Sequence, residues 1–166
     1  MKNIYESSFN KIEYSDKLKL LEISWLKKTE SMNENQFKSE FLTNLSIAQN
    51  YNFDKLIVDE SQFHFQRELH IEQWANSIIN TKQLKKSNKI KMAVVYSKES
   101  LQEIAIKKII TQMDLQDVET IYFESKVDAQ NWLLNGEIIP SNRQVLILYN
   151  NVFTDFSSYL DQKQVS

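Results

Sequence analysis

Hydrophobic and polar positions alternate with two different periods along the chain, and these periods predict strands and helices in a regular order. Ile12 and Tyr14 alternate with polar residues, and a strand-like pattern resumes from Leu18 to Trp25. Together these runs predict an antiparallel hairpin. Within the second run, the side that faces inward changes between Leu20 and Leu21, so either both faces of the strand are covered or a bulge lies there.

Four segments with helical periodicity follow the hairpin. The first starts at Asn33, which has the spacing of a capping box with Gln36, and runs to about Asn50. Met32 is placed to pack on the first turn as a hydrophobic staple. The inward face of this helix is predicted to carry Phe37, Phe41, Leu45 and Ala48, with Leu42 beside them. The other helices are predicted over 68–86, 97–113 and 125–136.

Short apolar runs separate these helices and predict buried strands over 56–59, 90–96 and 118–123. Because each pair of runs is joined by a helix-length connection, these strands are expected to be mutually parallel. The pattern thus predicts an α/β domain over residues 1–136, with a mixed, largely parallel sheet, an N-terminal antiparallel hairpin and about four helices.

The C-terminal extension, residues 137–166, is too apolar to be a linker. Val145 to Tyr149 predicts one more strand, and a short amphipathic helix is predicted from apolar residues at helical spacing, Phe153, Phe156, Tyr159 and Leu160. This extension either covers the core of its own chain or pairs with a second subunit in a homodimer.

Composition excludes several classes of function. The 166 residues include 20 Lys and Arg and 22 Asp and Glu, and a net charge of -2 supplies no basic field for nucleic acid. The chain has no cysteine and only one glycine, which excludes thiolate chemistry, cysteine-based metal sites and glycine-rich phosphate loops, and we expect no cofactor. The longest apolar run is too short to span a bilayer and the start lacks a secretory signal, so we expect a cytoplasmic protein.

The order of elements, together with several short motifs, resembles the bacterial STAS-like domains related to the anti-sigma-factor antagonists. The resemblance covers about residues 9–134 and is strongest to small stand-alone proteins with a kinship to the CRAL-TRIO lipid carriers. It implies an α/β fold of the STAS type and a regulatory or carrier role. The matching positions are Trp25, 32–38, Leu56-Ile-Val-Asp59, Trp74, Tyr122-Phe-Glu-Ser and Trp132-Leu133.

In this family, the regulatory segment follows the central strand, and it can be compared residue by residue. Asp59 and Ser61 match the family's strand-ending Asp and the following Ser, and Phe63 and Phe65 supply its apolar positions. The family's Asp-Ser-Ser-Gly is replaced by Arg67-Glu68-Leu69-His70. The resemblance therefore implies that the usual phosphoacceptor is missing, and Glu68 leaves a carboxylate where the helix dipole favours negative charge.

The same segment contains side chains that could serve catalysis or metal binding. His64, His70, Glu68 and Glu72 contain enough ligand types for a metal, but their spacing does not imply convergence, and we expect none. Asp59 could act with Glu60 and Glu68 as acid and base, but an Asp after a buried strand more commonly accepts backbone N–H groups. We therefore expect no catalytic residues.

These observations predict a non-catalytic protein-interaction or regulatory module that contacts its protein partner through the loop from Ser61 to His70. The alternative is a carrier of a small apolar or lipid-like ligand, with aromatic residues lining the cavity. The predicted binding residues for the two functions are Asp59, Ser61, Phe63, Phe65, Arg67, Glu68 and Trp74.

Overall fold

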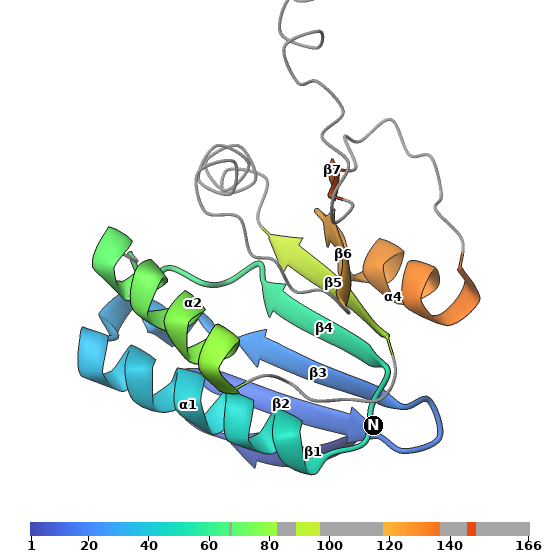
Figure 1. The fold of residues 1–166 in the computed structure, drawn as a ribbon, viewed down its shortest axis with the longest axis horizontal. Coiled ribbons are helices and arrows are strands. Elements are labelled where there is room, and N and C mark those ends of the chain that lie inside the picture. Colours follow the sequence, from blue (N-terminus) through green and yellow to red (C-terminus); the bar gives the residue numbers. More distant parts are fainter. Residues whose placement is uncertain (67, 83–88, 97–117, 137–145, 149–166) are drawn as a thin grey trace, which may run out of the picture.

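In the part of the chain that the structure describes, one mixed sheet of seven strands forms the framework, with helices on both faces (Figure 1). A computed structural model describes residues 1–66, 68–82, 89–96, 118–136 and 146–148. The prediction of an α/β domain with a mixed sheet is confirmed. The strands lie in the sheet in the same order as in the chain.

The sheet begins with an antiparallel part and continues with a parallel one. The predicted hairpin is formed by β2 (Asn10–Ser15) and β3 (Leu20–Trp25), and a further strand that the pattern did not indicate, β1 (Lys2–Glu6), pairs with β2. The predicted parallel arrangement of β4 (Lys55–Glu60), β5 (Ile90–Tyr96) and β6 (Val118–Phe123) is confirmed. In addition, β4 pairs parallel with β3.

The predicted strand of the extension is present as β7 (Leu146–Leu148), which pairs antiparallel with β6. It therefore continues the sheet of the domain. The amphipathic helix predicted after it lies outside the described residues.

The described residues contain three α-helices, where the sequence predicted about four. They are α1 (Glu34–Asn50), α2 (Leu69–Lys82) and α4 (Lys126–Asn135), and a short 3-10 helix, η1 (Lys27–Ser31), precedes α1. The helix predicted over 97–113 lies outside the described residues. Within this part of the chain, no helix is long and apolar enough to cross a membrane.

Helices cover both faces of the sheet. α1 and α2 lie side by side on one face and pack on Leu21 and Trp25 of β3 (Figure 1). α4 packs on the opposite face, where Trp132 and Leu133 join the same core cluster as Leu20. Because β3 pairs with both neighbours without a shift in register, the change of side at Leu20 reflects coverage of both faces and not a bulge.

The start of α1 has the predicted capping box. The side chain of Asn33 accepts from the backbone N–H of Gln36 at 2.9 Å, and the Gln36 side chain accepts from the backbone N–H of Asn33 at 2.9 Å. Buried Met32 packs in the same cluster as Phe37, as a hydrophobic staple requires. These contacts satisfy backbone groups that a free helix end leaves unpaired.

The inward face of α1 is more polar than predicted. Phe37 and Ala48 are buried as expected, but Glu40 and Asn44 are buried as well. The Tyr5 hydroxyl donates to Glu40 at 3.0 Å, and Asn44 accepts from the side-chain amide of Asn10 on β2. These two polar contacts join α1 to the antiparallel strands.

Both predicted ends of α4 are confirmed. Ser125 is the N-cap and accepts from the Asp128 backbone N–H at 3.5 Å. Gly136 ends the helix in the left-handed region, with φ of 70°, and its N–H donates to the carbonyl of Trp132 at 3.0 Å. Glycine suits this position because it adopts a positive φ without a steric penalty.

Candidate functional site

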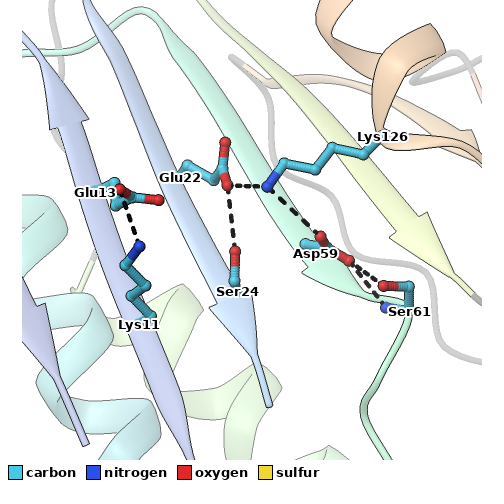
Figure 2. A network of polar contacts seen from close by, with 7 residues as sticks. All are labelled: Lys11, Glu13, Glu22, Ser24, Asp59, Ser61 and Lys126. Carbon is cyan, nitrogen blue, oxygen red and sulfur yellow. Dashed lines mark hydrogen bonds and ion pairs between the residues drawn. The ribbon is translucent and has the colours of Figure 1, made fainter. Parts of the chain in front are cut away.

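Asp59 lies near the carboxyl end of β4, where ligand sites of parallel sheets commonly lie. One carboxylate oxygen, Oδ1, accepts from the Ser61 backbone N–H at 3.1 Å and from the Ser61 hydroxyl at 2.6 Å (Figure 2). The structure thus brings together two of the predicted binding residues. By accepting both hydrogen bonds, Asp59 stabilises the turn that follows β4, as an Asp after a strand commonly does.

A buried carboxylate from the neighbouring strand lies on the same face of the sheet. Glu22 of β3 has a side chain that is only 3% exposed. Its Oε1 accepts from the ammonium of Lys126 and from the Ser24 hydroxyl, which lies at 3.3 Å (Figure 2). Because side chains alternate along a strand, Glu22 shares its face with Leu20 and points toward α4.

Lys126, the first residue of α4, joins the two carboxylates. Its Nζ contacts Glu22 and lies 3.9 Å from Asp59 Oδ2. Burial by itself would lower the pKa of Lys126, but the hydrogen bond and charge of Glu22, with the charge of Asp59, raise it above the usual lysine value. The amine therefore stays protonated at neutral pH, which suits a cation that holds carboxylates and not a base or a nucleophile.

A second ion pair extends this polar surface onto β2. Lys11 Nζ lies 3.1 Å from Glu13 Oε1, and Glu13 stands directly opposite Glu22 in the antiparallel register. Each of these two neighbouring carboxylates thus has its own lysine. We call the whole group the polar network; it consists of Lys11, Glu13, Glu22, Ser24, Asp59, Ser61 and Lys126 (Figure 2).

The carboxylates considered as acid–base partners of Asp59 are not on its side of the sheet. Glu60 is the next residue of β4, so it points to the face of α1 and α2. Glu68 precedes α2, and its Oε2 lies 3.4 Å from His70 Nδ1. Among the described residues, no group of three or more His, Asp or Glu side chains is arranged to hold a metal ion.

The predicted aromatic residues pack together on the face opposite the polar network. Phe65 stacks on Phe37 with ring centroids 5.1 Å apart, and Phe63 meets Trp25 at 5.2 Å. Trp74 of α2 lies 5.6 Å from Phe41 of α1. The sheet therefore divides the predicted binding residues into a polar pair and this aromatic cluster, which consists of Trp25, Phe37, Phe41, Phe63, Phe65 and Trp74.

The remaining predicted residues lie at the start of α2. Glu68 is exposed, whereas Arg67 lies outside the described residues. Leu69, the first residue of α2, is 60% exposed. Beside it, His70 Nε2 lies 3.2 Å from Oε2 of Glu34, the first residue of α1. This surface therefore combines an apolar side chain with charged groups from two helix ends.

Sequence reasoning missed Glu22 and Lys126, although each carried a signal. Glu22 is a charged residue within a run that is otherwise almost wholly apolar, which is unusual for a strand covered on both faces. Lys126 places a cation in the first turn of a helix, where the dipole disfavours it. Each of these positions indicates that a charged partner lies nearby in the fold. Neither signal identifies the partner residue.

The fold and the site define an α/β domain with a mixed sheet and a charge-compensated polar network on one face. Comparisons with known proteins find no match to this chain among protein-family models, curated proteins or solved structures.

Proposed function

We propose that the protein is a non-catalytic interaction or regulatory module that binds a partner protein through the segment from Ser61 to His70. The observation that carries this proposal is the 60% exposure of Leu69 at the first position of α2, between exposed Glu68 and His70. Protein contact surfaces combine apolar side chains at the centre with polar groups at the rim, and Leu69 with Glu68 and His70 offers this combination. The cytoplasm is the compartment we propose for this activity, from the sequence alone.

Backbone hydrogen bonds and aromatic packing hold residues 63–65 of this segment, which supports a role in recognition. The Phe63 N–H donates to the Glu60 carbonyl at 3.0 Å, and the His64 N–H donates to the Thr29 hydroxyl at 3.0 Å. Phe63 and Phe65 are anchored in the aromatic cluster. Backbone that is already held, as at residues 63–65, loses little conformational entropy when a partner binds.

The polar network supports the non-catalytic part of the proposal. The Asp59 carboxylate accepts two hydrogen bonds from Ser61, and Lys126 is held between Glu22 and Asp59. Chemistry at this site would require a base or nucleophile that is free to approach a substrate. A carboxylate and an ammonium that neutralise each other are better suited to fixing α4 on the sheet.

The kinship with STAS-like domains is also a proposal, and it rests on the sequence motifs. On that alignment, Glu68 takes the place of the regulatory phosphoserine region. A carboxylate carries its charge without a kinase, so we propose that the partner is bound constitutively and not in response to phosphorylation.

A carrier of apolar ligands is the second candidate, because Phe63, Phe65 and Trp74 are only partly buried. Their rings, however, meet one another and their neighbours at centroid distances of 5.1 to 6.2 Å, which is direct ring contact. This packing favours the interaction module. Native mass spectrometry of protein purified without denaturation separates the two candidates, since a carrier would retain a ligand mass and an interaction module would not.

Site-specific photo-crosslinking in the native host tests the contact surface. A photoreactive phenylalanine analogue replaces Leu69, and the matched control places it at Leu134, which is 43% exposed on α4. We expect a discrete protein adduct through residue 69 and none through residue 134. Glu68→Lys should reduce the adduct at residue 69, because it reverses a charge on the rim of the surface. Equal adducts at both positions, or none at residue 69, would contradict the proposal.

A further inference from the structure

The segment from Gln62 to Gln66 alternates between side chains that face the core and side chains that face solvent. Phe63 and Phe65 are partly buried in the aromatic cluster, whereas the side chains between and beside them are exposed, namely Gln62, His64 and Gln66. Amide and imidazole groups can both donate and accept hydrogen bonds. The segment therefore presents three hydrogen-bonding side chains on its outer side and is anchored by two aromatic rings on its inner side.

The hydroxyl of Thr29 holds the middle of this segment. Thr29 belongs to η1 and its exposure is 0%. Its Oγ1 donates to the Leu26 carbonyl at 2.9 Å and accepts from the His64 backbone N–H at 3.0 Å. The same oxygen lies 3.5 Å from the Gln62 carbonyl. One buried side chain thus joins η1 to the segment that carries the contact surface.

The hydrogen bond from the His64 N–H fixes which side chains of the segment point outward. η1 is itself held by backbone hydrogen bonds, since the Thr29 N–H donates to Leu26 at 3.0 Å and the Met32 N–H donates to Thr29 at 3.1 Å. A slip of the segment by one residue would turn both aromatic rings toward solvent and bring polar side chains into the aromatic cluster. Thr29 therefore selects one of the two possible phases of the alternation.

Packing alone does not require a hydroxyl at position 29, because valine has nearly the same shape as threonine. A buried hydroxyl is tolerated only where it is hydrogen-bonded. The bond from Thr29 to Leu26 lies within one turn, whereas the bond from His64 to Thr29 joins residues 35 positions apart in the chain. The long-range bond is the contribution that links this hydroxyl to the contact surface.

We propose that Gln62, His64 and Gln66 determine the specificity of the contact surface, and that Thr29 is the positioning residue that keeps them facing outward. This inference rests on the proposed function of the same segment. It names the chemistry of the partner, which is a protein surface that offers hydrogen-bonding groups, such as backbone amides, beside an apolar contact for Leu69. A partner without matching groups is rejected, because polar groups buried without a hydrogen bond are costly.

Amide hydrogen exchange on the full chain tests the positioning role without a partner. Thr29→Val removes the acceptor of the His64 N–H and keeps the shape of the side chain, whereas Thr29→Ser keeps the hydroxyl. We expect protection of the His64 N–H to fall about three- to tenfold in Thr29→Val, the scale of one hydrogen bond, and to be largely kept in Thr29→Ser. The matched control is Thr43→Val, because the Thr43 hydroxyl donates within α1, to the Ser39 carbonyl at 2.9 Å.

Two results of this experiment would overturn the positioning role. One is unchanged protection of the His64 N–H in Thr29→Val. The other is a loss of protection throughout the sheet, because Thr29 would then support the whole fold and not this segment.

Photo-crosslinking through residue 69 tests the specificity role. The double variant Gln62→Ala, His64→Ala should reduce the adduct about fivefold or more, the scale of two hydrogen bonds. Thr29→Val should reduce it as well, and Thr29→Ser should restore it. Asn135→Ala is the control and should leave the adduct unchanged, since Asn135 is exposed at the end of α4, on the opposite face of the sheet.

The two measurements separate this inference from the proposed function. Absence of any adduct in the natural protein, together with the expected exchange, contradicts the proposed function. A normal adduct that the double variant leaves unchanged contradicts the specificity role alone, and one that Thr29→Val leaves unchanged contradicts the positioning role alone.

Discussion

Lys126 at the start of α4 donates a hydrogen bond to the buried carboxylate of Glu22 in β3, 104 residues earlier in the chain (Figure 2). The Glu22 side chain is 3% exposed and that of Lys126 is 39% exposed. The ammonium thus reaches from the edge of α4 to compensate a charge inside the protein. The position of α4 and the charge balance of this sheet face therefore depend on each other.

Removing the ammonium should destabilise the protein. Lys126→Met leaves the Glu22 charge buried without its cation, which costs about 3–5 kcal/mol in a fully buried pair. Because Lys126 is partly exposed and screened by solvent, we expect a loss of about 1–3 kcal/mol in the free energy of unfolding. Urea denaturation of the variant and the natural protein measures it.

The matched control for this prediction removes the buried charge first. In a Glu22→Gln background, Lys126→Met should cost less than about 1 kcal/mol, because no uncompensated charge is left behind. If the stability losses of the two single variants simply add in the double variant, Lys126 stabilises α4 by some other contact.

The pair of Glu22 and Lys126 also predicts how stability changes with pH in the alkaline range. The carboxylates of Glu22 and Asp59 raise the pKa of Lys126 above the usual value, against the effect of burial. Because the pKa of Lys126 is higher in the folded than in the unfolded protein, its stabilising effect is complete below the unfolded-state pKa of about 10.4. The effect is lost as the pH rises through the folded-state pKa. The difference in unfolding free energy between the natural protein and Lys126→Met should be constant from pH 7 to 9 and shrink above about pH 10.4. A constant difference up to pH 11 would contradict this assignment.

The polar contact between α1 and β2 should also contribute to stability. Asn44→Ala removes the acceptor of the buried Asn10 amide, whose own Oδ1 atom already has no hydrogen-bond partner among the described residues. Leaving a buried donor unpaired costs about 1–3 kcal/mol. Asn35→Ala, at an exposed position of the same helix, is the control and should change stability by less than about 0.5 kcal/mol. Equal effects in thermal unfolding would contradict a role for the contact.

Phosphorylation of the contact surface is not expected. Ser61 carries the only hydroxyl between residues 61 and 70, and that hydroxyl donates to Asp59 at 2.6 Å. A phosphate there would place further negative charge beside the Asp59 carboxylate. Phosphopeptide mapping of protein from its native host should find Ser61 unmodified, and Ser61→Ala should leave crosslinking through residue 69 unchanged. Substantial occupancy at Ser61 would instead indicate a switch controlled by a kinase.

Local sequence signals were enough for most of the framework. The capping pair at Asn33 and the glycine at position 136 predicted helix ends correctly because cap contacts involve residues close in the chain. The parallel strands followed from the helix-length connections between them. The contact between Asp59 and Ser61 could be anticipated for the same reason, since only two positions separate them.

Other features depended on partners that are distant in sequence. β1 carries no regular apolar pattern, because it is an edge strand of largely exposed and half-buried residues held by pairing with β2. The burial of Glu40 and Asn44 became visible only with Tyr5 and Asn10 beside them. Polar residues can occupy an inward face where another element brings their partners, and periodicity does not contain that information.

The sequence by itself determined the order of the described strands from β2 onward and of helices α1, α2 and α4, the parallel core of the sheet and most boundaries of these helices, because these follow from local spacing and connection length. Only the tertiary structure decided which candidate residues meet. It placed Asp59 with Glu22 and Lys126 on one face of the sheet and Phe63 and Phe65 on the other. The physical reason is that a strand fixes alternate side chains on opposite faces, while the packing of distant helices selects what each face contacts.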